Sequence, residues 1–316
     1  MAFKFFFTTD IHGSERCFRK FINAAKFYEV QTIILGGDIT GKAIIPIIKG
    51  AKGTYTATIT NTSRTIADVD LSDLLKEIRF NGYYPYITTM DELAELEKDP
   101  DGKKKLFRTA IKESLESWFA LAEERLKPQG VKMYISPGND DDEIVDEVLK
   151  ASSFAINPED KVVELAPGIQ MISCGYSNPT PWDSPRELSE AELALKINPL
   201  AEQMSYQGVT IFNFHVPPYD TIIDQAPKLD STLKPIVQGG QVAMAGCGSK
   251  AVRAAIEKYQ PTIGLHGHVH EGAGAAKIGK TICVNPGSEY NDGILRGAIV
   301  TIDEKKKKAS YILTVG

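Results

Sequence analysis

The chain contains five histidines, and each lies in a short segment rich in aspartate, asparagine or glycine, or stands alone after an apolar run. The histidine segments are Asp10-Ile11-His12, His215 and His266-Gly267-His268-Val269-His270, and two segments of the same kind without histidine are Gly37-Asp38 and Gly138-Asn139-Asp140. Neutral imidazole is the commonest nitrogen ligand of metal ions in proteins, and carboxylate and amide oxygens suit harder cations. This combination predicts a mixed nitrogen and oxygen metal site, and it therefore favours an enzyme.

Taken singly, each segment is a weak signal. An Asp-x-His triplet occurs by chance, a Gly-Asp pair after a strand is often a turn, and His215 fits a lone structural histidine. The pair His268 and His270 is stronger, because residues i and i+2 of an extended segment lie on the same face. The joint occurrence of all the segments at the ends of predicted strands is what favours a functional site.

Buried strands are predicted directly before the first two segments. The runs 3–9 and 30–35 are apolar and β-prone, and the pattern over 15–29 between them is helical. In α/β sheets, ligands collect at the carboxyl ends of the strands. We therefore expect the segments that hold Asp10 and Asp38 to be neighbours in space.

A long insertion follows the second of these strands. About a hundred residues separate Asp38 from Asn139, where a βαβ unit typically needs about 30. The stretch contains predicted strands at 43–48 and 54–60, a turn at 61–63, helices at 71–80, 89–98 and 103–126, and a further buried strand at 131–136. We expect one domain over 1–316 with an inserted mixed α+β subdomain at about 43–105. A cap over the site and a decorative subdomain or dimer contact are equally open roles, so a homo-oligomer also stays open.

The second half of the chain is rich in predicted strands. They lie at 162–164, 170–174, 209–213, 262–265, 281–284, 298–302 and 310–314, and helices are predicted at 187–195 and 250–259.

Composition narrows the class of protein. The net charge of −5 does not favour nucleic acid as a partner. The four cysteines are far apart and form no C-x-x-C pair, which is typical of a reducing compartment. The apolar run at 3–9 is too short for a signal peptide, and no apolar run reaches the length of a membrane span. We expect a cytoplasmic protein with no membrane contact.

The order D-x-H, G-D, G-N-D, H and G-H-x-H resembles that of the calcineurin-like metallophosphoesterase superfamily. The resemblance covers most of the chain, with about 43–105 outside it. It implies an α/β fold, specifically a four-layer α/β/β/α sandwich that here carries the inserted cap. It also implies that metal one is bound by Asp10, His12, Asp38 and His270, and metal two by Asp38, Asn139, His215 and His268, with Asp38 bridging the two.

The residue types suit a site for two divalent cations. A carboxylate has two oxygens, so one aspartate can bind two cations, and the Asn139 carbonyl adds a ligand without adding charge. Two cations about 3.5–4 Å apart can share a hydroxide and polarise a phosphoryl group. The mixed ligands favour Mn, Fe or Zn over Mg.

One position departs from the superfamily pattern. Most proteins of this kind have a histidine where this chain has Asp140, and that histidine helps to protonate the leaving group. A carboxyl group with an ordinary pKa of about 3.9 is ionised at neutral pH and is a poor acid there. His266 is one candidate replacement, although a histidine that orients a metal ligand is at least as good an interpretation. The candidate catalytic residues are therefore Asn139, Asp140 and His266.

We expect a metal-dependent hydrolase of a small-molecule phosphoester, and a phosphodiesterase rather than a monoesterase. A protein or nucleotide phosphomonoesterase is the first alternative. A non-catalytic binding scaffold on the same fold is the second, and it is disfavoured because every expected ligand position is filled.

Overall fold

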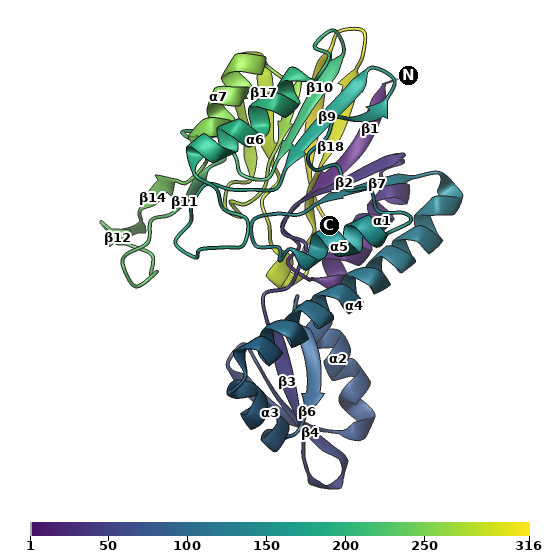
Figure 1. Ribbon diagram of the computed structural model, residues 1–316, viewed down its shortest axis with the longest axis vertical. Coiled ribbons are helices and arrows are strands. Elements are labelled where there is room, and N and C mark those ends of the chain that lie inside the picture. Colours follow the sequence, from purple (N-terminus) through teal and green to yellow (C-terminus); the bar gives the residue numbers. More distant parts are fainter. Residues whose placement is uncertain (1) are drawn as a thin grey trace.

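Two β-sheets form the main body of the computed structural model, which describes residues 2–316 (Figure 1). The first sheet has the order β19-β18-β1-β2-β7. Its strands are β1 (Phe3–Thr8), β2 (Thr32–Gly36), β7 (Lys132–Ser136), β18 (Arg296–Asp303) and β19 (Lys308–Val315). Strands β1, β2 and β7 are parallel, whereas β18 and β19 are antiparallel to their neighbours. The carboxyl ends of the three parallel strands therefore meet at one edge.

The second sheet has the order β16-β17-β15-β10-β9-β8. Its strands are β8 (Val163–Ala166), β9 (Ile169–Cys174), β10 (Val209–Phe214), β15 (Ile263–Leu265), β16 (Gly274–Ile278) and β17 (Thr281–Asn285). Strands β9, β10, β15 and β17 are parallel, and the edge strands β8 and β16 are antiparallel. This sheet supplies a second set of carboxyl ends.

Alternating side chains of β1 show how the two sheets pack. Phe5 and Phe7 lie in a buried cluster with residues of the second sheet such as Ile211. Phe6 points to the opposite face, as the two-residue period of a strand requires, and packs in a cluster with helices α1 (Glu15–Phe27), α4 (Pro100–Leu126) and α5 (Ile144–Ala151). The mixed α/β class expected from the sequence is confirmed.

The outer face of the second sheet is covered by two helices. Phe212 and Phe214 of β10 pack with residues of α6 (Glu190–Glu202) and α7 (Lys250–Tyr259). Helix α6 starts at a capping box between Ser189 and Glu192 and continues past the predicted end at 195, with Pro199 inside it. The interior proline is the reason that the sequence pattern predicts a shorter helix.

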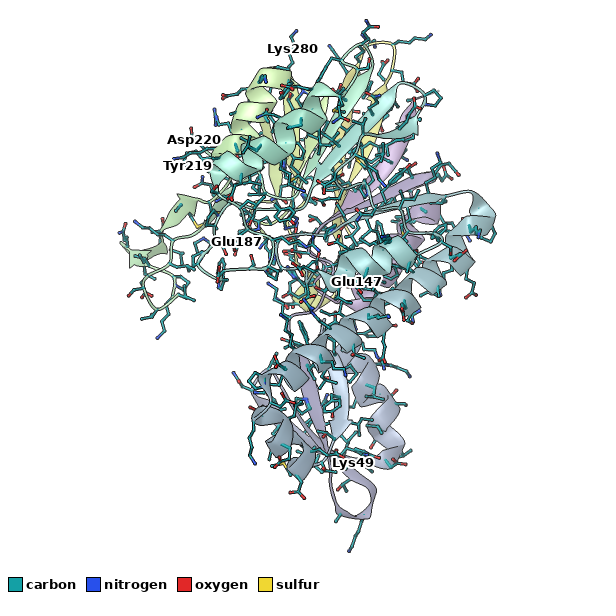
Figure 2. All side chains as sticks on the ribbon, in the orientation of Figure 1. Lys49, Glu147, Glu187, Tyr219, Asp220 and Lys280 are labelled. Carbon is teal, nitrogen blue, oxygen red and sulfur yellow. The ribbon has the colours of Figure 1, made fainter. Side chains whose placement is uncertain are left out.

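The inserted segment forms a separate lobe with a sheet of its own (Figure 1). Its strands have the order β5-β4-β3-β6: β3 (Ile44–Lys49), β4 (Thr54–Ile59), β5 (Thr62–Ala67) and β6 (Tyr84–Thr88). Helices α2 (Leu71–Phe80) and α3 (Met90–Glu97) belong to it, and a small core forms around Ile47, Ala57 and Ile78. Lys49, at the end of β3, lies at the far end of the lobe (Figure 2).

Helix α4 connects the lobe to the main body. Asp99 caps its first turn, and Pro100 occupies a position near the N-terminus where a missing N–H costs nothing. Trp118, further along the helix, stacks on Phe18 of α1 with ring centroids 4.4 Å apart. The helix thus returns the chain to the first sheet, as the sequence predicts for 103–126.

Three of the longer strands were not predicted, and each has a local reason. The turn between β4 and β5 is formed by Thr60 and Asn61, both with positive φ, so the hairpin turns earlier than the predicted 61–63 and β5 follows at once. Strands β6 and β16 lie at sheet edges. Pro85 is tolerated in an edge strand, and the alanine and glycine of β16 have low β-propensity.

A thin arm extends from the second half of the chain (Figure 1). It contains the short strands β11 (Gln225–Pro227), β12 (Val237–Gln238), β13 (Gln241–Val242) and β14 (Met244–Gly246), which pair as β11 with β14 and β12 with β13. These strands and helix α5 had also not been predicted. Over residues 2–316, no helix combines the length and the apolar character that crossing a membrane would need.

Candidate metal centre

The predicted ligand residues come together at the carboxyl ends of both sheets. Asp10 and His12 follow β1, Asp38 follows β2, Asn139 follows β7, His215 follows β10, and His268 and His270 follow β15. Three sets of ligand atoms lie within 4.8 Å of one another: Asp10, His12 and His270; Asp10, Asp38 and His215; and His12, Asp38 and Asp140. The sets share members, so they form one cluster.

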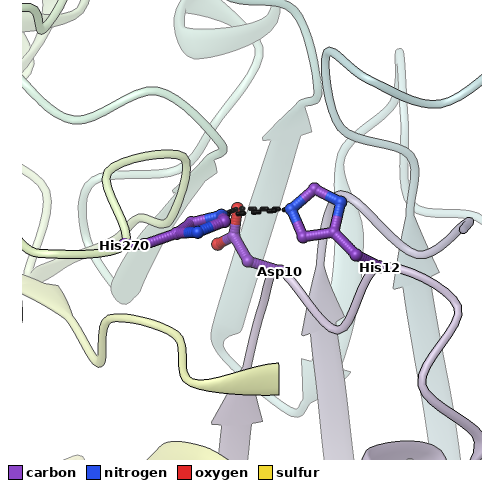
Figure 3. Close-up of side chains that lie close together, drawn as sticks. All are labelled: Asp10, His12 and His270. Atoms are coloured by element: carbon purple, nitrogen blue, oxygen red, sulfur yellow. Dashed lines mark hydrogen bonds and ion pairs between the residues drawn. The ribbon is translucent and has the colours of Figure 1, made fainter. Parts of the chain in front are cut away.

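Two histidines and one carboxylate form the first part of the cluster (Figure 3). The Nε2 atom of His270 lies 3.4 Å from Oδ1 of Asp10, and Nε2 of His12 lies 4.0 Å from the same oxygen. The two Nε2 atoms are 3.1 Å apart. His12 and Asp10 are each 1 % exposed, whereas the side chain of His270 is 30 % exposed, so this part of the cluster is buried on the side of His12 and reaches solvent at His270.

The second part of the cluster is centred on His215. Its Nε2 atom lies 3.3 Å from Oδ2 of Asp38 and 3.8 Å from Oδ1 of Asp10. Its Nδ1 atom lies 2.9 Å from the carbonyl oxygen of Gly36. A carbonyl only accepts, so Nδ1 donates to it, and the lone pair of the neutral ring is on Nε2, facing the two carboxylates.

His268 and Asn139 form the third part. His268 Nδ1 lies 2.6 Å from Asn139 Oδ1, and the backbone N–H of His268 donates to both oxygens of Asp10, at 3.1 and 3.0 Å. The His268 and His215 rings have centroids 5.5 Å apart. The amide oxygen that was predicted as a neutral ligand therefore faces the cluster together with an imidazole.

The backbone at this cluster is held in an uncommon conformation. Asp10, His12, Asp38 and His268 have φ angles of 53°, 38°, 51° and 65°, in the left-handed region that residues other than glycine seldom adopt. Hydrogen bonds between loops stabilise it, including those from the N–H of Asp10 to Gly37 O and from the N–H of His12 to Asp38 O, both 2.9 Å. Such strain concentrates at functional sites, where the surrounding structure imposes it.

The charges in the cluster are strongly coupled. Burial opposes ionisation of Asp10, but the charges of His215 and His270 outweigh it and lower the pKa of Asp10 to about 2. Burial likewise opposes the charge on His215, yet Asp38 and Asp10 raise its pKa to about 10. Burial lowers the pKa of His12 to about 3, so that ring is neutral. Without a metal, a proton on His215 partly neutralises the carboxylates, and a divalent cation would replace that proton.

Asp140 borders the cluster and pairs with a lysine that sequence reasoning missed. Its Oδ2 lies 2.7 Å from Nζ of Lys42, and its Oδ1 accepts a hydrogen bond from Nδ2 of Asn139 at 3.2 Å. Its backbone N–H donates to Oδ1 of Asp38 at 3.0 Å. Burial and the charge of Asp38 raise the pKa of Asp140, against the effect of Lys42. No motif marks Lys42 in the sequence, because its partner lies about a hundred residues away.

Asp141 was also missed, although the run of three aspartates after Asn139 was a signal. Its side chain is fully buried and accepts hydrogen bonds from the backbone N–H groups of Gly138, Ile39 and Thr40, at 2.8, 3.0 and 2.8 Å. The carboxylate thus ties the Asp38 loop to the Asn139 loop. It therefore fixes the distance between Asp38 and Asn139, two of the predicted ligands.

His266 is not part of any of the three sets of ligand atoms. It is fully buried, and its Nδ1 donates to the carbonyl oxygens of Phe214 and Val216, at 2.8 and 3.2 Å. Burial lowers its pKa to about 4. These two carbonyls flank His215, so the contacts favour a role of His266 in orienting that residue. The role of His266 as a leaving-group acid stays a prediction.

Tyr290 lines the cluster from the last part of the chain. Its ring centroid lies 4.6 Å from that of His12 and 5.9 Å from that of His270. The preceding turn also contributes, because the hydroxyl of Ser288 donates to the carbonyl oxygen of Asp10 at 2.6 Å. Both contacts restrict the ring of His12 and the loop that carries it.

Sequence similarity to a known protein covers part of the chain. No protein-family model matches the chain. An uncharacterized protein of Methanocaldococcus jannaschii, MJ1162, is 33% identical over 153 residues, which are 48% of this chain and 61% of that protein. The match therefore spans less than two thirds of the relative.

Structural similarity to solved proteins covers nearly the whole chain. One crystal structure has a TM-score of 0.54 at 16% identity, and that of TT1561 of Thermus thermophilus has 0.51 at 14%; each covers 99% of both chains. A novel archaeal phosphodiesterase aligns with a TM-score of 0.37 at 13% identity, over 98% of this chain and 99% of that one. The first two similarities show a shared fold. The buried cluster of aspartate and histidine agrees with the resemblance to the calcineurin-like metallophosphoesterases.

Proposed function

We propose that the protein is a metal-dependent phosphoester hydrolase that uses the buried cluster as a dinuclear centre. The observation that carries the proposal is the convergence of aspartate and histidine side chains from both sheets on one largely buried space, with Asn139 in contact with His268 beside it. Their order along the chain supports the superfamily assignment. The packing of both sheets and their outer helices supports the α/β/β/α sandwich that the assignment implies.

The residues fit a pair of divalent cations. Nε2 of His215 is buried without a hydrogen-bond partner among the described residues, although two carboxylates face it. An orphaned buried nitrogen of this kind is costly unless a ligand satisfies it. Metal one would be held by Asp10, His12, Asp38 and His270, and metal two by Asp38, Asn139, His215 and His268. When bound, such cations activate water and neutralise charge on a phosphoryl group, and the ligand types favour Mn, Fe or Zn.

The neighbours of these ligands hold them ready. Gly36 fixes the ring of His215 through Nδ1. The hydroxyl of Thr9 donates to Oδ2 of Asp10 at 2.7 Å. The backbone N–H of Asp140 donates to Asp38, and Asp141 ties the two loops together. Ligands that are held in this way by a second group lose little entropy when they bind a metal or substrate.

A small phosphodiester is the favoured substrate class. Asp140 stands where a proton-donating histidine would be expected, and its carboxylate is paired with an ammonium group. Ester cleavage without a general acid depends on a leaving group that tolerates negative charge. A phosphomonoester is the second candidate, because the positive charge of Lys42 beside the cluster suits a more highly charged phosphate.

The insertion at about 43–105 is proposed to border the mouth of the site. The loop between α2 and β6 and the residue just before the insertion both approach the loop of His12: a Cβ at Gly82 would collide with the carbonyl oxygen of His12, and a Cβ at Gly41 would collide with that of Gly82. Contacts this close require glycine. They support a position of the insertion beside His12, a predicted ligand.

Metal analysis followed by a paired assay tests the proposal. The purified protein should contain close to two divalent cations per chain after loading with Mn²⁺. It should then hydrolyse an activated diester faster than the corresponding monoester, and EDTA should abolish both reactions. Tight metal binding without any hydrolysis would instead support the scaffold alternative, and a faster monoester reaction would support the phosphomonoesterase.

A further inference from the structure

Lys42 lies at the junction between the Asp38 loop and the insertion. Its Nζ is 2.7 Å from Oδ2 of Asp140, and the side chains are 48% and 25% exposed. Asp140 in turn belongs to the set of ligand atoms with His12 and Asp38, all within 4.8 Å. The ammonium group is therefore at the rim of the cluster, with one side towards solvent.

The backbone directly before Lys42 is fixed by two hydrogen bonds. The N–H of Thr40 donates to Asp141 at 2.8 Å, and the N–H of Gly41 donates to the hydroxyl of Tyr84 at 2.9 Å. Gly41 also packs directly against the carbonyl of Gly82. An exposed lysine on a flexible loop loses side-chain entropy when it forms an ion pair, whereas here the loop already directs the side chain towards the cluster.

The charge of the rim suggests a ligand for this lysine. The cluster gathers the carboxylates of Asp10, Asp38 and Asp140, which would repel an incoming phosphoester. Bound cations would offset part of that charge, and an ammonium group at the entrance adds a positive charge and three donors. Lysine is a frequent binder of phosphate oxygens.

We propose that Lys42 is a substrate-binding residue that donates to a non-bridging phosphoryl oxygen of the ester held at the metal centre. The inference rests on the proposed function, since it concerns the same site. The phosphoryl group of the substrate would first meet the ammonium group of Lys42. A phosphoryl oxygen would then replace the Asp140 carboxylate as the partner of that ammonium group. The proposed contact involves the phosphoryl group and not the rest of the ester, so the binding of inorganic phosphate should depend on Lys42.

The test is calorimetric titration of the Mn²⁺-loaded protein with inorganic phosphate, together with steady-state hydrolysis of an activated diester. Lys42→Met should raise the Kd for phosphate about 10- to 100-fold, the range of a lost hydrogen bond to a charged group. Lys42→Arg should recover most of the affinity. Lys76→Met is the matched control, because Lys76 is an exposed lysine of the insertion paired with Asp73 at 3.1 Å, and its Kd should equal that of the wild type.

Lys42→Gln serves as a second neutral variant, and metal content and the melting temperature should be equal in all five proteins. An unchanged phosphate Kd in Lys42→Met, in a protein that hydrolyses esters, would overturn the inference and leave the proposed function intact. A Lys42-dependent phosphate Kd in a protein without hydrolysis would support the inference and refute the proposed function. Loss of metal from both neutral variants would show that Lys42 maintains the cluster, which also overturns the inference.

Discussion

Nε2 of His215 lies 3.3 Å from Oδ2 of Asp38, and the other ring nitrogen donates to the carbonyl of Gly36. The two residues come from different sheets, one from the loop after β10 and the other from the loop after β2. Their contact shows that the site is built across the interface between the sheets. Metal binding at this cluster would therefore be linked to the packing of the two sheets.

A pair of aspartate variants tests the division of ligands between two metals. Asp38 is predicted to bridge, so Asp38→Asn should lower the occupancy of both sites and remove nearly all activity. Asp10 is predicted to bind metal one only, so Asp10→Asn should keep close to one metal per chain. The measurement is metal content by mass spectrometry after gel filtration.

The geometry makes this comparison necessary, because Asp10 Oδ1 also lies 3.8 Å from Nε2 of His215. Equal losses in both variants would mean that Asp10 contributes to both sites. Two tightly bound metals and wild-type turnover in Asp38→Asn would refute the ligand assignment.

Metal affinity should rise with pH because of His215. Burial opposes its charge, but Asp38 and Asp10 raise its pKa from 6.5 to about 10. In the metal-free protein, this proton's contribution to stability is full below about pH 6.5 and is lost as the pH rises towards 10. A cation must displace the proton, so the apparent affinity should increase about tenfold per pH unit between about pH 6.5 and 8.5.

Competition titrations against a chelator of known affinity provide the measurement, and calorimetry in buffers of different ionisation enthalpy should show the released proton. His215→Gln is the control and should flatten the dependence on pH. Affinity that is constant over this range would mean that His215 is already neutral. Activity should follow occupancy and fall on acidification.

His266 should prove structural. His266→Ala leaves the carbonyls of Phe214 and Val216 without their donor, which should cost about 1–3 kcal/mol in the free energy of unfolding. His266→Asn keeps a donor near Nδ1 and should cost less. A structural role predicts that turnover per folded, metal-loaded molecule changes little, whereas loss of a general acid would lower it about 10²–10⁴-fold. Chemical denaturation and single-substrate kinetics separate the two.

The sequence predicts where the candidate ligands lie better than where their supporting residues lie. Strand ends locate Asp10 and Asp38, because parallel strands bring their carboxyl ends to one edge. The joining of the two sheets follows from the family resemblance and not from periodicity. Lys42 and Asp141 could not be placed, since each acts through a partner on another loop. The edge strand β6 was missed because Pro85 interrupts it, and β16 was missed because its glycine and alanines have weak β-propensity.

Substitution of Asp140 by histidine tests whether a proton donor is the missing element of the site. The wild type should favour esters with acidic leaving groups, because a carboxylate paired with Lys42 has no proton to give. Asp140→His should accelerate esters with basic, alkyl leaving groups more than aryl esters, by up to the roughly 10²–10⁴-fold typical of general acid catalysis. The measurement is the slope of log kcat/KM against leaving-group pKa, with metal content matched.

Asp140→Asn is the control: it keeps the shape of the side chain without an acidic proton and should leave the slope unchanged. An identical slope in Asp140→His would show that protonation does not limit the reaction. Loss of metal in Asp140→Asn would instead assign Asp140 to the metals, in keeping with its place beside His12 and Asp38.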